Sequence, residues 1–175
     1  MNTFQALRIT VALTAATVLS SGMLHADDRQ HNPDAFTWNP ELSKNGPVLV
    51  TVSLKSQTAA VYRNGIRIGS SEVSTGFKGH ETPTGVFHIL NKDKNHHSKT
   101  YGNASMPYSE RLTWDGVALH AGAVPGHPSS HGCIHLPYDF SKKLFGITHN
   151  GTTVVVTDEE PDVHVSHGHK VQFQD

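Results

Sequence analysis

The chain has 175 residues, 14 basic (Lys and Arg) and 15 acidic (Asp and Glu) side chains, and a formal net charge of −1 at pH 7. Charges of both signs are mixed along the sequence. This argues against a nucleic-acid-binding protein, because phosphate backbones are bound by clustered basic side chains.

Residues 1–26 are typical of a secretory signal peptide. Arg8 precedes an apolar run over residues 9–24, and Ala26 is a small residue of the kind that stands before a cleavage point. The apolar run is short and diluted by Ser and Thr, unlike a permanent membrane span, although an uncleaved N-terminal anchor is the alternative. We therefore predict an exported protein that begins at Asp27 and has no stable membrane span after processing. Such a mature chain is long enough for one domain with a hydrophobic core.

Residues 27–46 are predicted to form an irregular N-terminal arm. Apolar and polar residues then alternate over 48–54, as in a half-buried strand, with four aliphatic residues on one face: Val48, Val50, Val52 and Leu54. Two β-rich runs within 59–69 flank Asn64-Gly65. This dipeptide favours the positive φ angles of a type I′ hairpin turn.

The middle of the chain continues with short β-rich segments. Residues 70–76 are expected to extend the sheet of the hairpin, and a Pro/Gly turn leads into a strand within 82–90. Residues 91–113 are rich in Asn, Lys, Ser, His and Tyr and predict a long polar loop, and loops of that length are often functional. Residues 116–120 and the β-branched run at 152–158 predict two more strands.

One helix is predicted at 137–146. Pro137 suits the first helical position and Gly146 suits the C-cap. Phe140 and Leu144 are four residues apart and would face the core together.

The stretch PSSHGCIHLP at residues 128–137 contains the single cysteine of the chain, Cys133. Cysteines of exported proteins usually form disulfides, and a single one cannot form an internal bridge. Three alternatives follow: a buried inert side chain, a disulfide with a partner chain, or a free reactive thiol.

A reactive thiol requires a lowered pKa or a neighbouring base, and acyl transfer also requires hydrogen-bond donors for the oxyanion. Gly132 allows a tight turn beside Cys133, where successive backbone N–H groups can converge on an oxyanion. The dipole of the following helix would help to hold a thiolate. His131 and His135 are close in sequence, but His120, at the end of a predicted strand, is the better-placed base.

Three sequence blocks stand in an order that points to a known family. The segment LHAGAVPGHPSSHGCIH contains an early histidine followed by Ser-His-Gly-Cys, which are here His120, Ser130, His131, Gly132 and Cys133. Upstream lie VTVSLKSQTAAVYRNGIRIGSSEVSTG and the Thr-Pro-x-Gly-x-Phe pattern of HETPTGVFHI. Over residues 47–158 the chain thereby resembles the L,D-transpeptidase catalytic domain (YkuD-type) of bacterial cell-wall enzymes.

The resemblance implies a role for each residue of this motif. Cys133 would be the nucleophile and His120 its general base and acid. The backbone carbonyl of Ala121 would orient the imidazole, in place of the third member of a triad. Backbone N–H groups of His131, Gly132 and Cys133 would line the oxyanion hole.

The resemblance also implies the fold and the reaction. The fold is a mainly β sandwich with one helix beside the active-site loop. Cys133 would attack the peptidoglycan stem peptide between its third residue, diaminopimelate, and D-alanine, and form a thioester. An amine of another stem peptide, or of an outer-membrane lipoprotein, would resolve it without a metal or organic cofactor. The compartment implied is the periplasm, and carbapenems would acylate Cys133.

Substrate-binding roles are expected for Ser130, His135, Trp114 and Tyr101. Packing is the alternative explanation for the two aromatic residues. His135 departs from the family, which usually has Arg or Asn two residues after the cysteine to hold a carboxylate. A neutral histidine binds an anion less well than Arg, and its charge would change near pH 6.5.

Other functions remain open from the sequence. Water could resolve the thioester, which would make the protein an L,D-carboxypeptidase or an endopeptidase that uses the same Cys-His site. The polar tail at 159–175 could bind a metal through His164, His167 and His169. A non-catalytic wall-binding protein is the third alternative.

Overall fold

The computed structural model describes residues 35–159. The predicted signal peptide, the first part of the predicted arm and residues 160–175, which include the three tail histidines, lie outside this range. Within it, the elements in chain order are β1 (Phe36–Trp38), η1 (Pro40–Leu42), β2 (Val48–Ser53), β3 (Thr58–Arg63), β4 (Ile66–Glu72), β5 (Gly85–His88), β6 (Asn91–His97), β7 (Ser105–Arg111), β8 (Ala118–Ala121), β9 (Ile134–Leu136), α1 (Tyr138–Ile147) and β10 (Thr153–Thr157).

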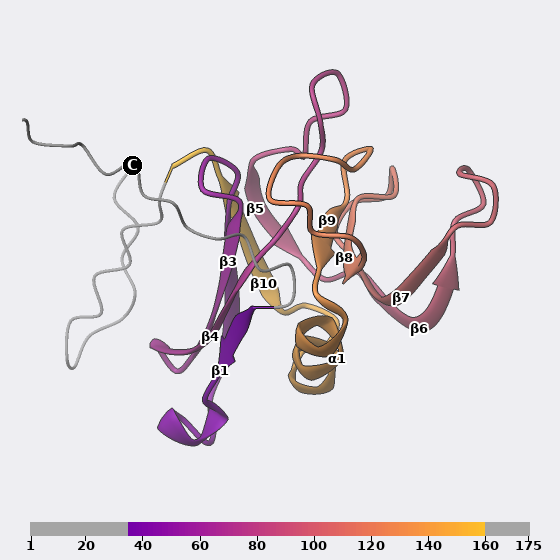
Figure 1. Ribbon diagram of the computed structural model, residues 1–175. Coiled ribbons are helices and arrows are strands. Elements are labelled where there is room, and N and C mark those ends of the chain that lie inside the picture. Colours follow the sequence, from indigo (N-terminus) through magenta and orange to yellow (C-terminus); the bar gives the residue numbers. More distant parts are fainter. Residues whose placement is uncertain (1–34, 160–175) are drawn as a thin grey trace, which may run out of the picture. The chain divides into compact units, whose positions relative to one another are not determined.

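The strands form two sheets, which confirms the predicted mainly β fold (Figure 1). Sheet A has the order β1-β4-β3-β2-β10-β5, and all its pairs are antiparallel except β2 with β10. Sheet B has the order β6-β7-β8-β9, with β8 and β9 parallel. None of the helices within residues 35–159 is long and apolar enough to cross a membrane.

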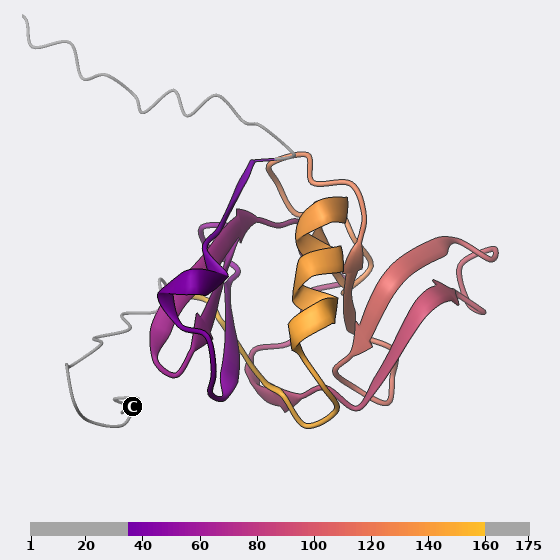
Figure 2. The same cartoon turned by 90° about the horizontal axis from the view of Figure 1, so that it is seen from below.

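Helix α1 packs between sheet A and the strands of sheet B, as Figure 2 shows. The predicted pair Phe140 and Leu144 is fully buried in the core, together with alternate residues of the central strands such as Val50, Val52 and Val154. Strands β2, β5 and β10 are found within the segments predicted for them, and β3 and β8 each extend one residue beyond theirs, to Thr58 and Ala121. Alternation is clearest in β10, where Val154 and Val156 are buried and the residues between and beside them are half-buried.

The β3–β4 hairpin confirms the turn prediction. Asn64 and Gly65 have φ angles of 51° and 76°. Two successive positive φ angles are what a type I′ turn requires.

The predicted arm at 27–46 is not irregular where it is described. β1 pairs with β4, and the rings of Phe36 and Trp38 contact the ring of Phe140 with centroids 5.6 and 5.5 Å apart. Two aromatic residues that share one face of a three-residue strand make too short a pattern to be recognised as periodic.

The predicted loop at 91–113 is also wrong, because this segment forms the β6–β7 hairpin. Its strands carry mostly polar side chains, a composition typical of loops. Those of β6 are largely exposed, whereas Tyr108, Ser109 and Glu110 of β7 are buried. The backbone groups of the two strands nevertheless pair with each other, so the hairpin does not depend on side-chain polarity.

Helix α1 is shifted by one residue from its prediction. Pro137 is the N-cap and not the first helical residue, Gly146 lies inside the helix, and Thr148 is the C-cap. The last turn of α1 has no basic residue. Instead, a lysine of β6 donates hydrogen bonds to carbonyl groups at this C-terminus and complements the helix dipole there.

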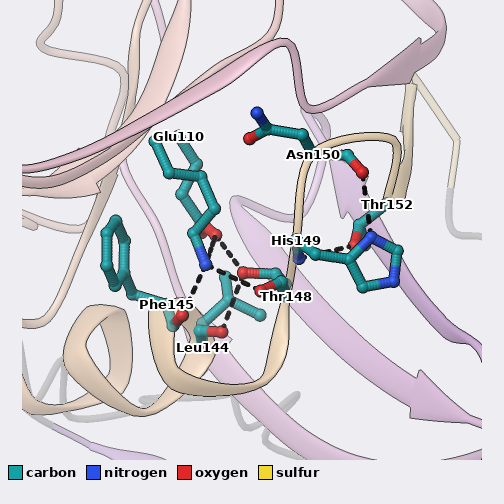
Figure 3. Close-up of polar contacts among 8 residues, drawn as sticks. Glu110, Leu144, Phe145, Thr148, His149, Asn150 and Thr152 are labelled. Carbon is teal, nitrogen blue, oxygen red and sulfur yellow. Dashed lines mark hydrogen bonds and ion pairs between the residues drawn. The ribbon is translucent and has the colours of Figure 1, made fainter.

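That lysine, Lys92, belongs to a buried polar cluster at the end of α1. Figure 3 labels other members of this cluster, Glu110, Phe145 and Thr148. Lys92 Nζ donates to the carbonyl oxygens of Phe145 and Thr148 at 2.6 and 2.7 Å and lies 3.8 Å from Glu110 Oε1. The hydroxyl of Thr148 also donates to Glu110, whose side chain is fully buried. The cluster ties the base of the β6–β7 hairpin to α1.

Burial controls the protonation of this cluster. It raises the pKa of Glu110 to about 7, against the opposing effects of the Thr148 hydroxyl and of Lys92. Between the ordinary value of 4.5 and about 7, the folded state therefore binds this proton more tightly than the unfolded state does. Stability consequently falls as the pH rises through that window.

Replacing Lys92 by Met is expected to lower the free energy of unfolding by about 3 kcal/mol at pH 8, because it leaves the Glu110 carboxylate buried without its partner. The loss should be smaller at pH 5, where the carboxyl is neutral and needs no counter-charge. Urea denaturation at both pH values measures the difference. Lys94→Met, an exposed lysine two residues along the same strand, is the control and should change stability by less than about 0.5 kcal/mol. Equal losses at the two pH values would contradict the assignment.

Candidate active site

The parallel pairing of β8 with β9 brings the predicted nucleophile and base together. In its register His120 is opposite His135 and Leu119 is opposite Ile134. Cys133 precedes β9 and is two residues from His135, so its side chain projects from the same face of the sheet as His120 and His135. The intervening aliphatic residues, Leu119 and Ile134, are fully buried on the other face.

His120 is buried and has a defined tautomer. Its Nδ1 lies 2.9 Å from the carbonyl oxygen of Ala121. Because a carbonyl can only accept, Nδ1 carries the proton and Nε2 is left as the basic nitrogen. Burial lowers the pKa of His120 to about 4, which the hydrogen bond from Nδ1 to Ala121 opposes only in part. The imidazole is therefore neutral at pH 7 and able to accept a proton.

Cys133 is a neutral thiol in this structure. Its Sγ donates to the carbonyl oxygen of Gly116 at 3.7 Å. Burial raises the pKa of the thiol, and a backbone hydrogen bond from Ala118 opposes this. Strand β9 separates Cys133 from α1, and the contribution of the helix dipole to a thiolate stays a prediction.

Ser130 and Gly132 shape the loop before the nucleophile. Gly132 has a φ of 111°, a conformation that side chains disfavour, so glycine is required here. The Ser130 hydroxyl accepts from the Gly132 N–H at 3.1 Å and donates to the Cys133 carbonyl at 2.5 Å. The Gly132 N–H is therefore engaged in this structure, and the oxyanion roles of His131 and Gly132 stay predictions.

Thr82 is a positioning residue that the sequence analysis did not identify. Its buried hydroxyl accepts from the Gly76 N–H and donates to the Gly132 carbonyl, both at 2.9 Å. Thr82 therefore links Gly76, in the segment that follows β4, to the loop that contains Cys133. The signal was present in the Thr-Pro-x-Gly-x-Phe pattern, which begins with this residue.

The predicted substrate-binding residues have different surroundings. The His135 ring lies 4.7 Å from the His120 ring, and its Nδ1 is 3.1 Å from the Ala123 carbonyl. Burial lowers the pKa of His135, so this side chain carries no charge at pH 7. Tyr101 packs against His131 with ring centroids 4.9 Å apart, whereas Trp114 is 78% exposed in the β7–β8 connection. Their binding roles stay predictions.

The fold and this site define a class of protein. Residues 47–156 match the L,D-transpeptidase catalytic domain family (YkuD). The chain belongs to this family, as its sequence motifs indicated.

Individual relatives agree with the family. The chain is 31% identical over 130 residues to L,D-transpeptidase 1 of Mycobacterium tuberculosis (strain ATCC 25618 / H37Rv), a match that covers 65% of this chain and 52% of the relative. The chain thus spans about half the length of the curated relatives that it matches. Among solved structures, an L,D-transpeptidase (Yku) from Stackebrandtia nassauensis superposes with a TM-score of 0.60 at 33% identity, over 68% of this chain and 58% of that one. The LD transpeptidase LdtMt1 in complex with imipenem gives a TM-score of 0.58 at 27% identity, over 63% and 58% of the two chains.

The neutral Cys133–His120 pair predicts a distinct pH dependence of alkylation. The rate of Cys133 alkylation by iodoacetamide should rise with pH, with a midpoint above the ordinary thiol value of about 8.5 and no plateau between pH 5 and 7. Intact-protein mass spectrometry measures this rate directly, since the chain has one cysteine. The same chain in urea is the control and should titrate near the ordinary value. A plateau at pH 5–7 would indicate a thiolate–imidazolium pair and contradict this account.

Proposed function

We propose that the protein is a peptidoglycan L,D-transpeptidase with Cys133 as the nucleophile. The observation that carries the proposal is the position of a neutral, buried His120, with Nδ1 held by Ala121, on the same sheet face as Cys133. Membership of the L,D-transpeptidase catalytic domain family supports the reaction class.

In the first half-reaction, His120 Nε2 takes the proton of the Cys133 thiol as the sulfur attacks the carbonyl between diaminopimelate and D-alanine. This route suits a thiol with a raised pKa, because the proton leaves only as the sulfur attacks. His120 then gives the proton to the nitrogen of D-alanine, which leaves with the broken C–N bond. A thioester joins the tripeptide stem to Cys133.

In the second half-reaction, a deprotonated amine of another stem peptide or of a lipoprotein lysine attacks the thioester. His120 accepts a proton from the attacking nitrogen and returns it to the sulfur as the C–S bond breaks. Donors for the oxyanion come from the backbone of the nucleophile loop, and losing one such donor would cost about 3 kcal/mol. The loop conformation is kept by Ser130 and Thr82.

The proposal extends to location and inhibition. An exported enzyme of this kind would act in the periplasm on the peptidoglycan layer and contribute to cell-wall cross-linking and cell shape. A relative that is 27% identical is solved in complex with imipenem, which supports acylation of Cys133 by carbapenems in this protein.

Hydrolysis is the second candidate, as an L,D-carboxypeptidase or endopeptidase. The Cys133 side chain is half-buried and not sealed from solvent, so that water could also reach a thioester on it. The same two residues would serve both reactions, and only the acceptor differs.

Incubation of the purified protein with a disaccharide-tetrapeptide tests the proposal by mass spectrometry of the products. The expected product is a dimer that lacks one D-alanine, and Cys133→Ala should reduce its formation by more than about a thousandfold, because the nucleophile is removed.

Monomeric tripeptide as the only Cys133-dependent product would contradict transpeptidation and identify a hydrolase. Unchanged substrate in wild-type and variant samples would contradict both enzyme proposals. Tryptic mapping of the alkylated protein confirms that Cys133 is accessible in the sample.

A further inference from the structure

The short segment from Ser74 to Phe77, which follows β4, holds both ends of the nucleophile loop. At one end, the backbone N–H of Phe77 donates to the Ser130 carbonyl at 3.0 Å. At the other end, Ser74 and His135 exchange two backbone hydrogen bonds, of 3.1 and 2.8 Å. The position of the Cys133 backbone between these two attachments therefore depends on the position of this segment.

Thr75 is the central anchor within the segment. Its carbonyl oxygen accepts from the N–H groups of Ser129 and Ser130, at 2.9 and 3.0 Å. The nucleophile loop begins at these residues, and the Ser130 hydroxyl bonds in turn to the Gly132 N–H and the Cys133 carbonyl. Thr75 is buried, so water does not compete for these bonds. A displacement of Thr75 would therefore be passed on to the nucleophile.

The side chain that holds Thr75 belongs to Gln57, in the turn between β2 and β3. Its Oε1 accepts from the Thr75 N–H at 3.0 Å, and its Nε2 donates to the Thr75 hydroxyl at 2.7 Å. Nε2 also donates to the Leu54 carbonyl at 2.8 Å. One buried amide thereby uses both of its donor hydrogens and holds the backbone and the side chain of Thr75 at once.

The backbone conformation of Gln57 would suit a glycine better. Its φ angle of 53° lies in the left-handed region, which glycine adopts readily and which costs other residues free energy. The Gln57 carbonyl accepts from the Val73 N–H at 2.8 Å, a bond that needs no side chain. Glycine could therefore form this turn, but it would lack the amide that holds Thr75. Strained residues of this kind are retained where the side chain has a function.

We propose that Gln57 is a positioning residue of the reaction, which fixes the nucleophile loop through Thr75. The inference rests on the proposed function. The hydrogen bonds run from Gln57 through Thr75 and Ser130 to the Cys133 carbonyl. Acyl transfer requires one geometry of the sulfur and of the backbone donors around it, and a displacement of about 1 Å can cost about a hundredfold in rate.

Gln57→Glu tests the proposal, because a carboxylate has the shape of the amide but no donor. Release of D-alanine from the disaccharide-tetrapeptide gives kcat and KM. At pH 8, kcat should fall about thirty- to a hundredfold while KM changes by less than about threefold, because the contacts with substrate are intact. Near pH 5 the buried carboxyl is protonated and can donate, so the ratio of this kcat to the wild-type kcat should recover by about fivefold or more.

Two control variants separate positioning from a general loss of stability. Gln57→Gly removes the amide and relieves the backbone, so its kcat should be low at pH 8 and should not recover near pH 5 relative to wild type. Val154→Ala creates a cavity in the core at β10, so it should lower the thermal midpoint and leave kcat within about twofold of wild type. Circular dichroism establishes that each variant is folded.

Hydrogen–deuterium exchange measures the order of the nucleophile loop without turnover. The peptide that spans residues 128–135 should exchange about tenfold faster in Gln57→Glu than in wild type at pH 8, because Thr75 no longer holds the N–H groups of Ser129 and Ser130. The peptide that spans α1 is the internal control and should exchange at the wild-type rate, which a general loss of stability would not allow.

A wild-type kcat in the folded Gln57→Glu protein, or a wild-type rate of loop exchange, would overturn the positioning role. Equal recovery of Gln57→Gly and Gln57→Glu near pH 5 would also overturn it, because the new carboxyl would then not be the cause. Absence of Cys133-dependent product from the wild-type protein would instead overturn the proposed function. The exchange measurement distinguishes the two failures, since it needs no turnover.

Discussion

The parallel pairing of β8 with β9 is the constraint on which the site depends. Its alternation buries Leu119, Ile134 and Leu136 in the core and directs His120 and Cys133 to the opposite face. The same burial that stabilises the pairing also desolvates the two functional groups. It favours the neutral form of both side chains, as the proposed mechanism requires. In the proposed mechanism, the proton would therefore leave the thiol only as the sulfur attacks the substrate.

The β6–β7 hairpin has different surroundings on its two faces. On one face, Lys92 and Glu110 attach its base to the C-terminus of α1, and the Tyr108 ring packs against Tyr138 and Phe145 at 5.4 and 5.6 Å. Tyr108 does so with a φ of 56°, an unusual conformation for a bulky residue. The other face carries Asp93, Ser109 and Arg111, which line a small cleft together with Gly116 and Ala118. The contacts with α1 thus fix the position of the polar groups on the opposite face of the hairpin.

The sequence predicted those parts of the fold in which one face is buried. Aliphatic alternation identified β2 and β10, and Asn64-Gly65 identified the turn between β3 and β4. The β6–β7 hairpin was missed because both of its faces are polar, and β9 because three residues carry no period. The order of motifs indicated that Cys133 and His120 belong together. Thr82 was not found as a site residue, because only its hydrogen bond to the Gly132 carbonyl brings it to the nucleophile loop.

The central claim is that His120 activates Cys133, and the rate of acylation by imipenem measures this step alone. Time-resolved intact-protein mass spectrometry follows the adduct on the single cysteine. His120→Ala, verified as folded, should slow adduct formation about 10²- to 10⁴-fold. His149→Ala, a distant exposed histidine, should react at the wild-type rate. Acylation of the folded His120→Ala protein at the wild-type rate would contradict the account.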